Sequence, residues 1–321
     1  MAFVIGNMGM VHAQKSAPVA VDDSYELGID FTLQKNASNG LLANDSDANG
    51  NATMSVQTSP VIDPANGSVS INADGSFTYT PDSGYIGNDT FRYRVCDDGT
   101  PNNTVSLFDF DNPDLTIATI GPDATSVNPL AAQLGCGIYF PTGAGGSTGF
   151  DINVPNTGGI FNFTSFRVFF EYEDQEGTAD IVTAGNFRVY HITGNELGIR
   201  VDVIDGVTGS PTSYTTTLGS FIAGNVPYSI SYDEVTGNIT YTANGTTSVI
   251  ALAPPNSPLN TANATDILLG RFMDGSGSTR PSLCSMGFVD NSRLCDEADV
   301  FLTIGAKVIT NRKITYRVNP N

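Results

Sequence analysis

Tryptophan is absent from this chain of 321 residues, and there are only two histidines. Basic residues are also few, because 14 Lys and Arg stand against 33 Asp and Glu, which gives a formal net charge of −19. Charged residues make up 15% of the chain, below the roughly 25% of typical soluble domains, so the acidity comes from missing Lys and Arg. Nucleic acid and anionic lipid need a basic surface, and the composition argues against both as partners.

Long apolar runs are missing as well. No segment approaches the roughly 18 consecutive apolar residues of a membrane-spanning helix, so we expect no membrane insertion. Residues 2–11 form a short apolar run that ends in Val11-His12-Ala13, a small-x-small cleavage pattern without the usual basic beginning. We interpret residues 1–16 as the remnant of an export signal, with a frayed strand as the alternative. The protein is therefore expected to be secreted, extracellular or at the cell surface.

Strong helix formers are sparse, whereas Thr, Val, Ile, Tyr and Phe are plentiful, and this balance favours an all-β fold. Residues 18–100 contain short segments of strand character, such as the alternating Val19–Tyr25. Ser68–Ile71 and Phe77–Thr80 flank Asp74-Gly75, which is a strong hairpin signal. Strands at this spacing, separated by turns of this kind, predict a β-sandwich.

Five motifs follow one another within residues 17–101. They are Ala17-Pro-Val-Ala-Val-Asp-Asp23, Gly40-Leu-Leu-Ala-Asn-Asp-Ser-Asp47, Asn66-Gly-Ser-Val, Asp74-Gly-Ser-Phe-Thr-Tyr-Thr-Pro81 and Tyr85-Ile-Gly-Asn-Asp-Thr-Phe-Arg-Tyr93. In this order they resemble the bacterial cadherin-like tandem repeats of surface adhesins. The resemblance implies an Ig-like sandwich of about seven strands that often binds Ca²⁺ and serves as a spacer in large secreted proteins.

One feature departs from the pattern of these repeats. Their Asp-Asp-Gly-Thr-Pro turn, here at 97–101, is normally followed by the last strand, but about 190 residues of different character intervene. Only then does Leu294–Ile304 resemble that missing strand. The resemblance thus implies a cadherin-like domain of residues 17–102 plus 294–305, with a domain of residues 103–293 inserted at an exposed turn, where insertions are tolerated.

The four cysteines permit three pairings. None lies in a C-x-x-C motif or near a histidine, so a zinc site is not expected. If residues 103–293 are an inserted domain, Cys96 and Cys295 flank its two ends and can form a disulfide. Cys136 and Cys284 are then left to pair within the insert. Buried thiols or a mixed pairing are the alternatives.

The insert again has the character of an all-β domain. Five of its segments carry a further resemblance: Gly137-Ile-Tyr-Phe-Pro, Phe166-Arg-Val-Phe-Phe-Glu-Tyr, Gly185-Asn-Phe-Arg-Val-Tyr, Ile267-Leu-Leu-Gly-Arg-Phe-Met-Asp-Gly and Gly287-Phe-Val-Asp-Asn. These pieces resemble laminin-G-like domains of the concanavalin-type jelly-roll fold. We therefore predict an Ig-like (cadherin-like) β-sandwich with an inserted jelly-roll β-sandwich.

Aspartates at strand ends are the clearest candidates for ligand chemistry. Ca²⁺ takes roughly six to eight oxygen ligands, and Asp-rich turns supply them. Asp45-x-Asp47-x-Asn49 has the first spacings of an EF-hand loop, but no Glu closes it, so we interpret it as an irregular calcium loop. The alternative is that these side chains only form turns with the backbone. The candidate ligands are Asp22, Asp23, Asp45, Asp47, Asn49, Asp97 and Asp98 in the first domain, and Asp109, Asp111, Asp274 and Asp290 in the insert.

Catalysis is the next possibility, because jelly rolls of this type include laminarinase-like glycosidases. Their signature is a strand that carries Glu-x-Asp-x-(x)-Glu, in which carboxylates act as nucleophile and acid. In Glu171-Tyr-Glu173-Asp174-Gln-Glu176 the middle acid is Glu, and Asp174 breaks the alternation. The chain also has no tryptophan to stack on sugar. We therefore expect no enzymatic activity and keep a glycoside hydrolase as an alternative.

Residues 306–321 differ from the rest of the chain because they contain no acid. Their strand-like part is Ile314-Thr-Tyr-Arg-Val318. The first interpretation is a linker to a further domain. The second is a strand that adds to the sheet edge of a neighbouring subunit, which builds filaments. The residues that would act in assembly are Lys307, Arg312, Lys313, Tyr316 and Arg317.

Together these features predict an extracellular, non-enzymatic protein of adhesion or structure, stabilised by Ca²⁺. Its expected partner is a glycan or another surface protein. The alternative is a subunit of a self-assembling filament joined by strand donation. Candidate platforms on which a sugar could stack, if they do not belong to the core, are Tyr139, Tyr172, Tyr190, Tyr232 and Tyr241.

Overall fold

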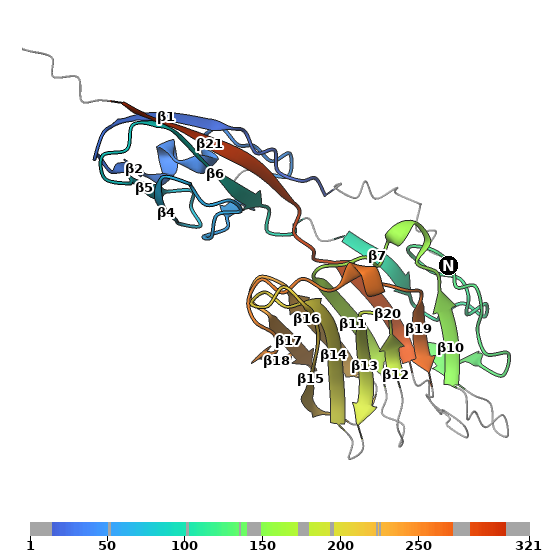
Figure 1. Cartoon of the computed structure of the whole chain (residues 1–321). Helices are drawn as coiled ribbons and strands as arrows, with labels where there is room; N and C mark the ends of the chain where they lie inside the picture. Colours follow the sequence, from blue (N-terminus) through green and yellow to red (C-terminus); the bar gives the residue numbers. More distant parts are fainter. Residues whose placement is uncertain are drawn as a thin grey trace, which may run out of the picture. The chain divides into compact units, whose positions relative to one another are not determined.

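The computed structural model describes residues 15–50, 53–100, 103–134, 136–139, 149–172, 180–192, 196–222, 224, 226–271 and 283–305. Within these residues the regular structure is strand, apart from short 3₁₀ turns such as Ala37–Asn39 and Leu41–Ala43, so the predicted all-β fold is confirmed. The chain divides into two compact units (Figure 1). Among the described residues, 15–100 and 294–305 form one, here called the split unit. Residues 101–293 form the other, the continuous unit.

The split unit contains two sheets. The larger has the strand order β1-β21-β6-β3, and the smaller has the order β2-β5-β4. Strand β21 pairs antiparallel with β6 and parallel with β1, so a strand that follows the continuous unit in sequence lies inside the larger sheet. The bounds are β1 (Asp23–Gly28), β2 (Leu33–Lys35), β3 (Ser55–Val56), β4 (Gly67–Ile71), β5 (Phe77–Pro81), β6 (Gly87–Cys96) and β21 (Cys295–Gly305).

The core of the split unit follows from the period-two alternation of its strands. Phe91 and Tyr93 of β6 face inward and are fully buried, with Val300 of β21 beside them. The ring of Phe77 from β5 meets the ring of Phe91 edge to face, with the centroids 5.7 Å apart. The alternate residues of β6 face outward, where Arg92 pairs with Asp299. Because such ion pairs are partly exposed, the buried aromatic residues dominate the stability of this unit.

The continuous unit also contains two sheets. The six-stranded sheet has the order β10-β19-β12-β13-β14-β15, and the eight-stranded sheet has the order β18-β17-β16-β11-β20-β9-β8, with β7 also paired to β20. The bounds are β7 (Asn103–Phe108), β8 (Ala132–Leu134), β9 (Gly137–Tyr139), β10 (Gly149–Val154), β11 (Phe166–Tyr172), β12 (Asp180–Thr183), β13 (Phe187–Ile192), β14 (Glu196–Ile204), β15 (Pro211–Ser220), β16 (Val226–Asp233), β17 (Asn238–Ala243), β18 (Thr246–Ala251), β19 (Ile267–Arg271) and β20 (Leu283–Asp290).

Aromatic rings join the two sheets of the continuous unit. Phe166 of β11, in the eight-stranded sheet, stacks on Phe187 of β13, in the six-stranded sheet, with the ring centroids 4.4 Å apart. Phe170 of β11 stacks on Tyr228 of β16 within the eight-stranded sheet. These side chains are buried and belong to one continuous core. This arrangement is a sandwich, because both sheets bury their apolar faces against each other.

Two disulfides link the four cysteines. Cys96 and Cys295 lie directly opposite each other where β6 and β21 pair, and they are bonded. Cys136 is bonded to Cys284 of β20. Within the described residues, no helix has the length and apolar character that crossing a membrane requires.

Candidate functional site

The outward face of the eight-stranded sheet contains a hollow of about 400 Å³. Alternation along β11 produces it, because Phe166, Val168 and Phe170 face the core and the residues between them face outward. The strands β16, β17 and β20 supply the rest of the lining. The lining residues are Arg167, Phe169, Phe170, Glu171, Pro227, Tyr228, Ser229, Thr242, Gly245 and Ser285. The side chains of Phe170 and Tyr228 are buried in the core.

Phe169 forms the apolar part of this hollow. Gly287 of β20 lies directly opposite Phe169, and a Cβ atom at Gly287 would collide with the Phe169 ring. The ring therefore lies over the glycine backbone of the neighbouring strand, where only glycine leaves room for it. The guanidinium Cζ of Arg167 is 5.8 Å from the centroid of the same ring. The ring is thus supported by backbone on one strand and accompanied by a cation on its own strand.

Besides the buried Phe170 and Tyr228, the hollow combines the ring of Phe169 with one cation, one carboxylate and several hydroxyl groups. Sites that bind small polar ligands have this composition, with apolar area for contact and a few polar groups for orientation. Glu171 is the one carboxylate among the lining residues that the structure describes. Glycoside hydrolysis needs a pair of carboxyl groups roughly 5 to 9.5 Å apart. Glu173, Asp174 and Glu176 lie outside the described residues.

The tyrosines that the sequence suggests as stacking platforms lie elsewhere. Tyr172, Tyr232 and Tyr241 are buried in the core of the continuous unit, so they are not available to a ligand. Tyr139 and Tyr190 are half-buried outside the hollow. The aromatic residue of the hollow is a phenylalanine that the sequence analysis did not single out.

The first group of calcium candidates lies where the chain enters β1. Asp45 is buried, and its Oδ1 accepts hydrogen bonds from the Val21 N–H at 2.8 Å and the Tyr93 hydroxyl at 3.1 Å. Burial, together with the nearby Asp45 carboxylate, raises the pKa of Asp23 to about 7. Asp22 is exposed and accepts a hydrogen bond from the Asp299 N–H. The structure thus brings Asp23 and Asp45 close enough for their charges to interact.

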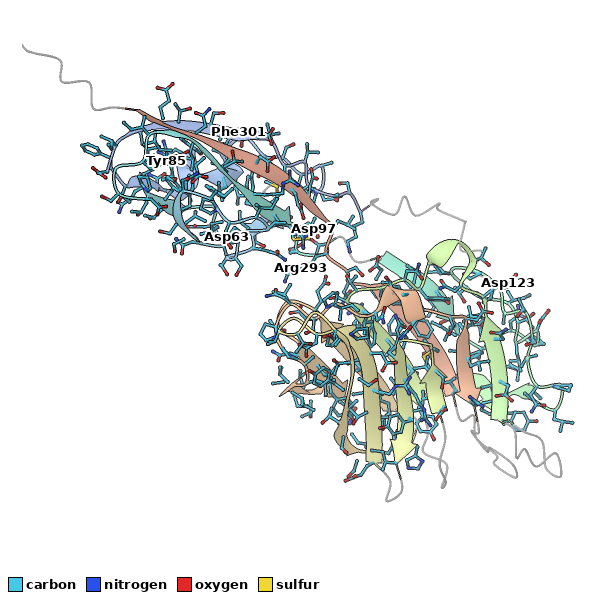
Figure 2. All side chains as sticks on the ribbon, in the orientation of Figure 1. Asp63, Tyr85, Asp97, Asp123, Arg293 and Phe301 are labelled. Carbon is cyan, nitrogen blue, oxygen red and sulfur yellow. A yellow bond between two sulfur atoms is a disulfide. The ribbon has the colours of Figure 1, made fainter. Side chains whose placement is uncertain are left out.

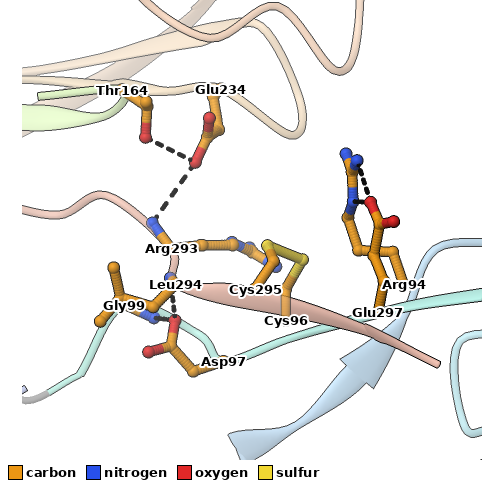
Figure 3. Close-up of a disulfide and its surroundings, with 10 residues drawn as sticks. All are labelled: Arg94, Cys96, Asp97, Gly99, Thr164, Glu234, Arg293, Leu294, Cys295 and Glu297. Carbon is orange, nitrogen blue, oxygen red and sulfur yellow. Dashed lines mark hydrogen bonds and ion pairs between the residues drawn. A yellow bond between two sulfur atoms is a disulfide. The ribbon is translucent and has the colours of Figure 1, made fainter. Parts of the chain in front are cut away.

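The second group lies at the end of β6. Asp97 is fully buried, and its Oδ1 accepts hydrogen bonds from the N–H groups of Gly99 and Leu294, each at 2.9 Å (Figure 3). Its Oδ2 is buried without a hydrogen bond. Burial raises the pKa of Asp97; the charge of Asp47 also raises it, and Lys15 acts in the opposite direction. Asp47 and Asp97 are therefore close in space, although 50 positions separate them in sequence.

Other candidates in the split unit serve local structure. Asp47 Oδ1 accepts a hydrogen bond from the Asn49 N–H at 2.7 Å, and Asn49 Oδ1 accepts one from the Ser16 N–H at 2.7 Å. Asp98 accepts hydrogen bonds from both the N–H and the hydroxyl of Thr100. The contacts of Asp47 and Asp98 are local turns of the kind that Asp commonly forms, whereas the bond between Asn49 and Ser16 joins segments 33 positions apart.

The candidates in the continuous unit are dispersed. Asp109 accepts a hydrogen bond from the Thr119 hydroxyl, Asp290 accepts one from the Ser292 N–H, and Asp111 is exposed. Asp274 lies outside the described residues. Across the part of the chain that the structure describes, no group of three or more His, Cys, Asp or Glu is arranged to hold a metal ion.

Glu234 is a half-buried acid that the sequence gives no reason to single out. Its Oε1 accepts hydrogen bonds from the Thr164 hydroxyl at 3.0 Å and the Arg293 N–H at 3.3 Å (Figure 3). Burial raises its pKa. Glu234 therefore anchors the last residue of the continuous unit to the body of that unit. The residues proposed for assembly, Lys307, Arg312, Lys313, Tyr316 and Arg317, lie outside the described residues.

Comparison with known proteins adds one family match. Residues 15–130 match the family model of the bacterial cadherin-like domain, which is just over a third of the chain. The match extends past residue 100, at which the split unit is interrupted. No curated protein matches the chain.

Several solved structures are similar at low identity. The CBM40 of the Ruminococcus gnavus IT-sialidase has a TM-score of 0.32 at 12% identity, covering 46% of this chain and 89% of the module. Trypanosoma rangeli sialidase in complex with sialic acid has a TM-score of 0.37 at 15% identity, covering 60% of this chain and 31% of the sialidase. The SAP-like pentraxin of Limulus polyphemus has a TM-score of 0.24 at 12% identity, covering 43% and 64%. At TM-scores this low the likeness carries no argument about this chain.

Proposed function

We propose that this protein is an extracellular, non-enzymatic adhesion protein that binds a saccharide in the hollow of its continuous unit. The observation that carries the proposal is the Phe169 ring, which is supported by Gly287 and lies among the polar side chains of an open sheet face. The C–H face of a pyranose would pack on this ring. Its hydroxyl groups would bond to Arg167, Glu171 and the neighbouring Ser and Thr side chains.

The size and chemistry of the hollow support this function. A volume of about 400 Å³ lies in the lower part of the range for ligand pockets, roughly 300 to 1,000 Å³, and suits a short saccharide. Arg167 donates hydrogen bonds and Glu171 accepts them, so vicinal hydroxyl groups of one sugar can satisfy both. With a single described carboxylate, the hollow supports binding rather than bond cleavage.

The architecture supports an extracellular role. The family match at residues 15–130 supports a cadherin-like split unit, and we propose that the continuous unit is a laminin-G-like jelly roll inserted before its last strand. The two disulfides are typical of proteins that fold in oxidising compartments. The split unit would then act as a spacer that presents the binding unit.

Calcium belongs to the same proposal. Asp23 and Asp45 interact through their charges, as do Asp47 and Asp97, and burial raises the pKa of Asp23, Asp45 and Asp97. A bound Ca²⁺ would remove this repulsion and use the buried Oδ2 of Asp97, which has no hydrogen bond. The remaining ligands would be backbone carbonyls, Asn49 and water. In this role Ca²⁺ stiffens turns of the split unit and takes no part in chemistry.

The test is a glycan array followed by calorimetry on the best ligand. We expect Phe169→Ala to weaken binding at least about tenfold, because loss of a stacking ring costs more than 1 kcal/mol. The matched control is Phe301→Ala, because Phe301 is an exposed phenylalanine of the split unit at 46% exposure (Figure 2). An array without any bound saccharide, or a Phe169→Ala variant that binds as tightly as the unmodified protein, would contradict the proposal.

The enzymatic alternative is tested with the same saccharides. We expect no release of reducing sugar from any glycan that binds, including β-glucans. Turnover that Glu171→Gln abolishes would replace the adhesion proposal with a glycosidase.

A further inference from the structure

The eight-stranded sheet ends in an unprotected edge. Strand β18 is the last strand of this sheet, and among the described residues it pairs with β17 alone, in continuous register. Its six residues include no charged residue and no proline, and Val249 is 62% exposed. Soluble proteins usually block such edges with charges, proline or bulges, because an open edge pairs with other strands.

The hydrogen bonds around β18 show which backbone groups point outward. The Asn244 N–H donates to the Pro227 carbonyl of β16, so the preceding residue, Ala243, directs its backbone groups toward β18. The Leu252 N–H donates to the Gly237 carbonyl, on the β17 side. By alternation, the backbone N–H and C=O groups of Thr246, Ser248 and Ile250 point toward β17 and form the hydrogen bonds to it. The N–H and C=O groups of Thr247, Val249 and Ala251 therefore face the open edge.

Three other edge strands of the protein, β15, β10 and β1, carry protection. Strand β15 begins with Pro211 and has a register shift where Leu197 and Gly198 of β14 oppose it. Strand β10 is covered by the segment before it, because the N–H groups of Thr125 and Asn128 donate to carbonyls of β10. Strand β1 carries Asp23 and Glu26. The edge of β18 has none of these features.

We propose that β18 accepts residues 314–318 of a second copy of this chain as an added antiparallel or parallel strand. This inference goes beyond saccharide binding and does not depend on it. The segment Ile314-Thr-Tyr-Arg-Val318 alternates, with Ile314, Tyr316 and Val318 on one side and Thr315 and Arg317 on the other. The apolar side would continue the core face beside the half-buried Ile250. The polar side would lie on the outward face with Val249.

Charge and length favour this occupant. Lys307, Arg312, Lys313 and Arg317 contribute +4 to a chain of −19, so residues 1–305 carry −23 and attract the segment electrostatically. Strand β21 ends at Gly305, and residues 306–313 can span roughly 26 Å at about 3.3 Å per residue. A donor segment in one copy and an acceptor edge in the next form a contact that generates a closed exchange dimer, a larger ring or a filament.

The experiment compares assembly of four proteins by light scattering and electron microscopy over a range of concentration and salt. They are the full chain, a variant without residues 314–321, Val249→Pro and Thr215→Pro. Val249→Pro removes an outward N–H from β18 and leaves its pairing with β17 intact. Thr215→Pro is the matched control on β15. The N–H of Asp202 points to Asn186, away from β15, so its partner Ser213 directs its own backbone groups to the open edge. By alternation the N–H of Thr215 points to the same edge. Thermal melts establish that each variant is folded.

We expect the full chain and Thr215→Pro to form dimers or larger assemblies, and assembly to weaken at high salt. The other two variants should remain monomeric. A labelled peptide of residues 306–321 should bind the truncated protein, and Val249→Pro in the truncated protein should weaken that binding about tenfold or more. Should Val249→Pro fail to fold, Val249→Lys serves in its place, because an edge lysine blocks strand addition. A full chain that is monomeric at every concentration, or a Val249→Pro variant that assembles normally, would overturn the proposal.

Discussion

The Leu294 N–H donates a hydrogen bond of 2.9 Å to the carboxylate of Asp97, a residue 197 positions earlier in the sequence. The same oxygen accepts a hydrogen bond from the Gly99 N–H. The preceding amide, that of Arg293, is bound separately by Glu234 within the continuous unit. The chain that returns to the split unit is therefore held at two consecutive amides, by the buried Asp97 and the half-buried Glu234, and desolvation raises the pKa of both carboxyl groups.

The first prediction concerns Asp97. Asp97→Ala leaves the buried N–H of Gly99 and the part-buried N–H of Leu294 without an acceptor, so we expect it to lower the free energy of unfolding of the split unit by about 3 kcal/mol. Asp97→Asn retains an oxygen acceptor and removes a buried charge, so its cost should be about 1 kcal/mol or less. Chemical denaturation, with β6 amide exchange to identify the split unit, measures both. Equal losses for the two variants would show that the charge, and not the acceptor, is what stabilises this turn.

The second prediction concerns the disulfide next to that turn. Cys96 and Cys295 are 199 positions apart, and in the chain-entropy account a crosslink that closes so long a loop stabilises by about 5 kcal/mol. We expect the double variant Cys96→Ser and Cys295→Ser to lose a comparable amount from the split unit. The matched control is Cys136→Ser with Cys284→Ser, which should destabilise the continuous unit instead. Loss of less than about 1 kcal/mol from the split unit would contradict the prediction.

The sequence predicts the strands better than it predicts the segments that lead into them. The resemblance of Leu294–Ile304 to the last strand of cadherin-like repeats implies a strand, and β21 spans Cys295–Gly305 and pairs with β6. The strand predicted over Val19–Tyr25 begins at Asp23, because Val19 instead pairs with Ser46 across the entry to β1. Periodicity shows which side chains share a face, whereas an entry segment is decided by its tertiary partners.

The site is the part that sequence reasoning missed. The hollow depends on Gly287 lying opposite Phe169, which are 118 positions apart, and periodicity along either strand carries no information on that register. Alternation does place Tyr172 on the same face as Phe166 and Phe170, so its burial was open to prediction. For the calcium candidates, the sequence places Asp residues at turns, but the choice between backbone amides and a cation depends on distances that only the fold sets.

The third prediction is a pH dependence of the split unit in calcium-free buffer. Burial and the Asp45 charge raise the pKa of Asp23 from 3.8 to about 7, so the folded protein retains a proton that the unfolded chain releases near pH 4. Stability from this group is therefore present at low pH and is lost as the pH rises through about 7. We expect the split unit to melt several degrees higher near pH 5.5 than near pH 8.

The variant Asp23→Asn should flatten this dependence, because it removes the titrating carboxyl. Asp299 has its pKa lowered by Arg92, so it stays charged across this interval and contributes no change there. Thermal melts at several pH values, with exchange of β1 amides to identify the split unit, provide the measurement. A melting temperature that rises between about pH 5.5 and 8 would contradict the sign of the prediction.

The fourth prediction concerns calcium. We expect millimolar Ca²⁺ to raise the melting temperature of the split unit and EDTA to reverse the effect, because a cation relieves the repulsion between Asp23 and Asp45. Mg²⁺ should act more weakly, since it requires a more regular set of ligands. Asp45→Asn should reduce the effect, whereas Asp63→Asn, at an exposed position of the same unit, should leave it unchanged. If Ca²⁺ and Mg²⁺ shift the melting temperature equally, nonspecific screening explains the effect.

The fifth prediction tests the support of the Phe169 ring. A methyl group at position 287 would collide with that ring, so Gly287→Ala should tilt it away from the sheet and weaken saccharide binding about tenfold. Gly305→Ala is the control, because nothing lies near the position of its Cβ atom. The ring-proton shifts of Phe169 in NMR spectra report the displacement without any ligand. If the ring-proton shifts change while binding does not, Phe169 does not contact the saccharide. If neither changes, the Phe169 ring accommodates a methyl group at position 287 without moving, which contradicts the prediction.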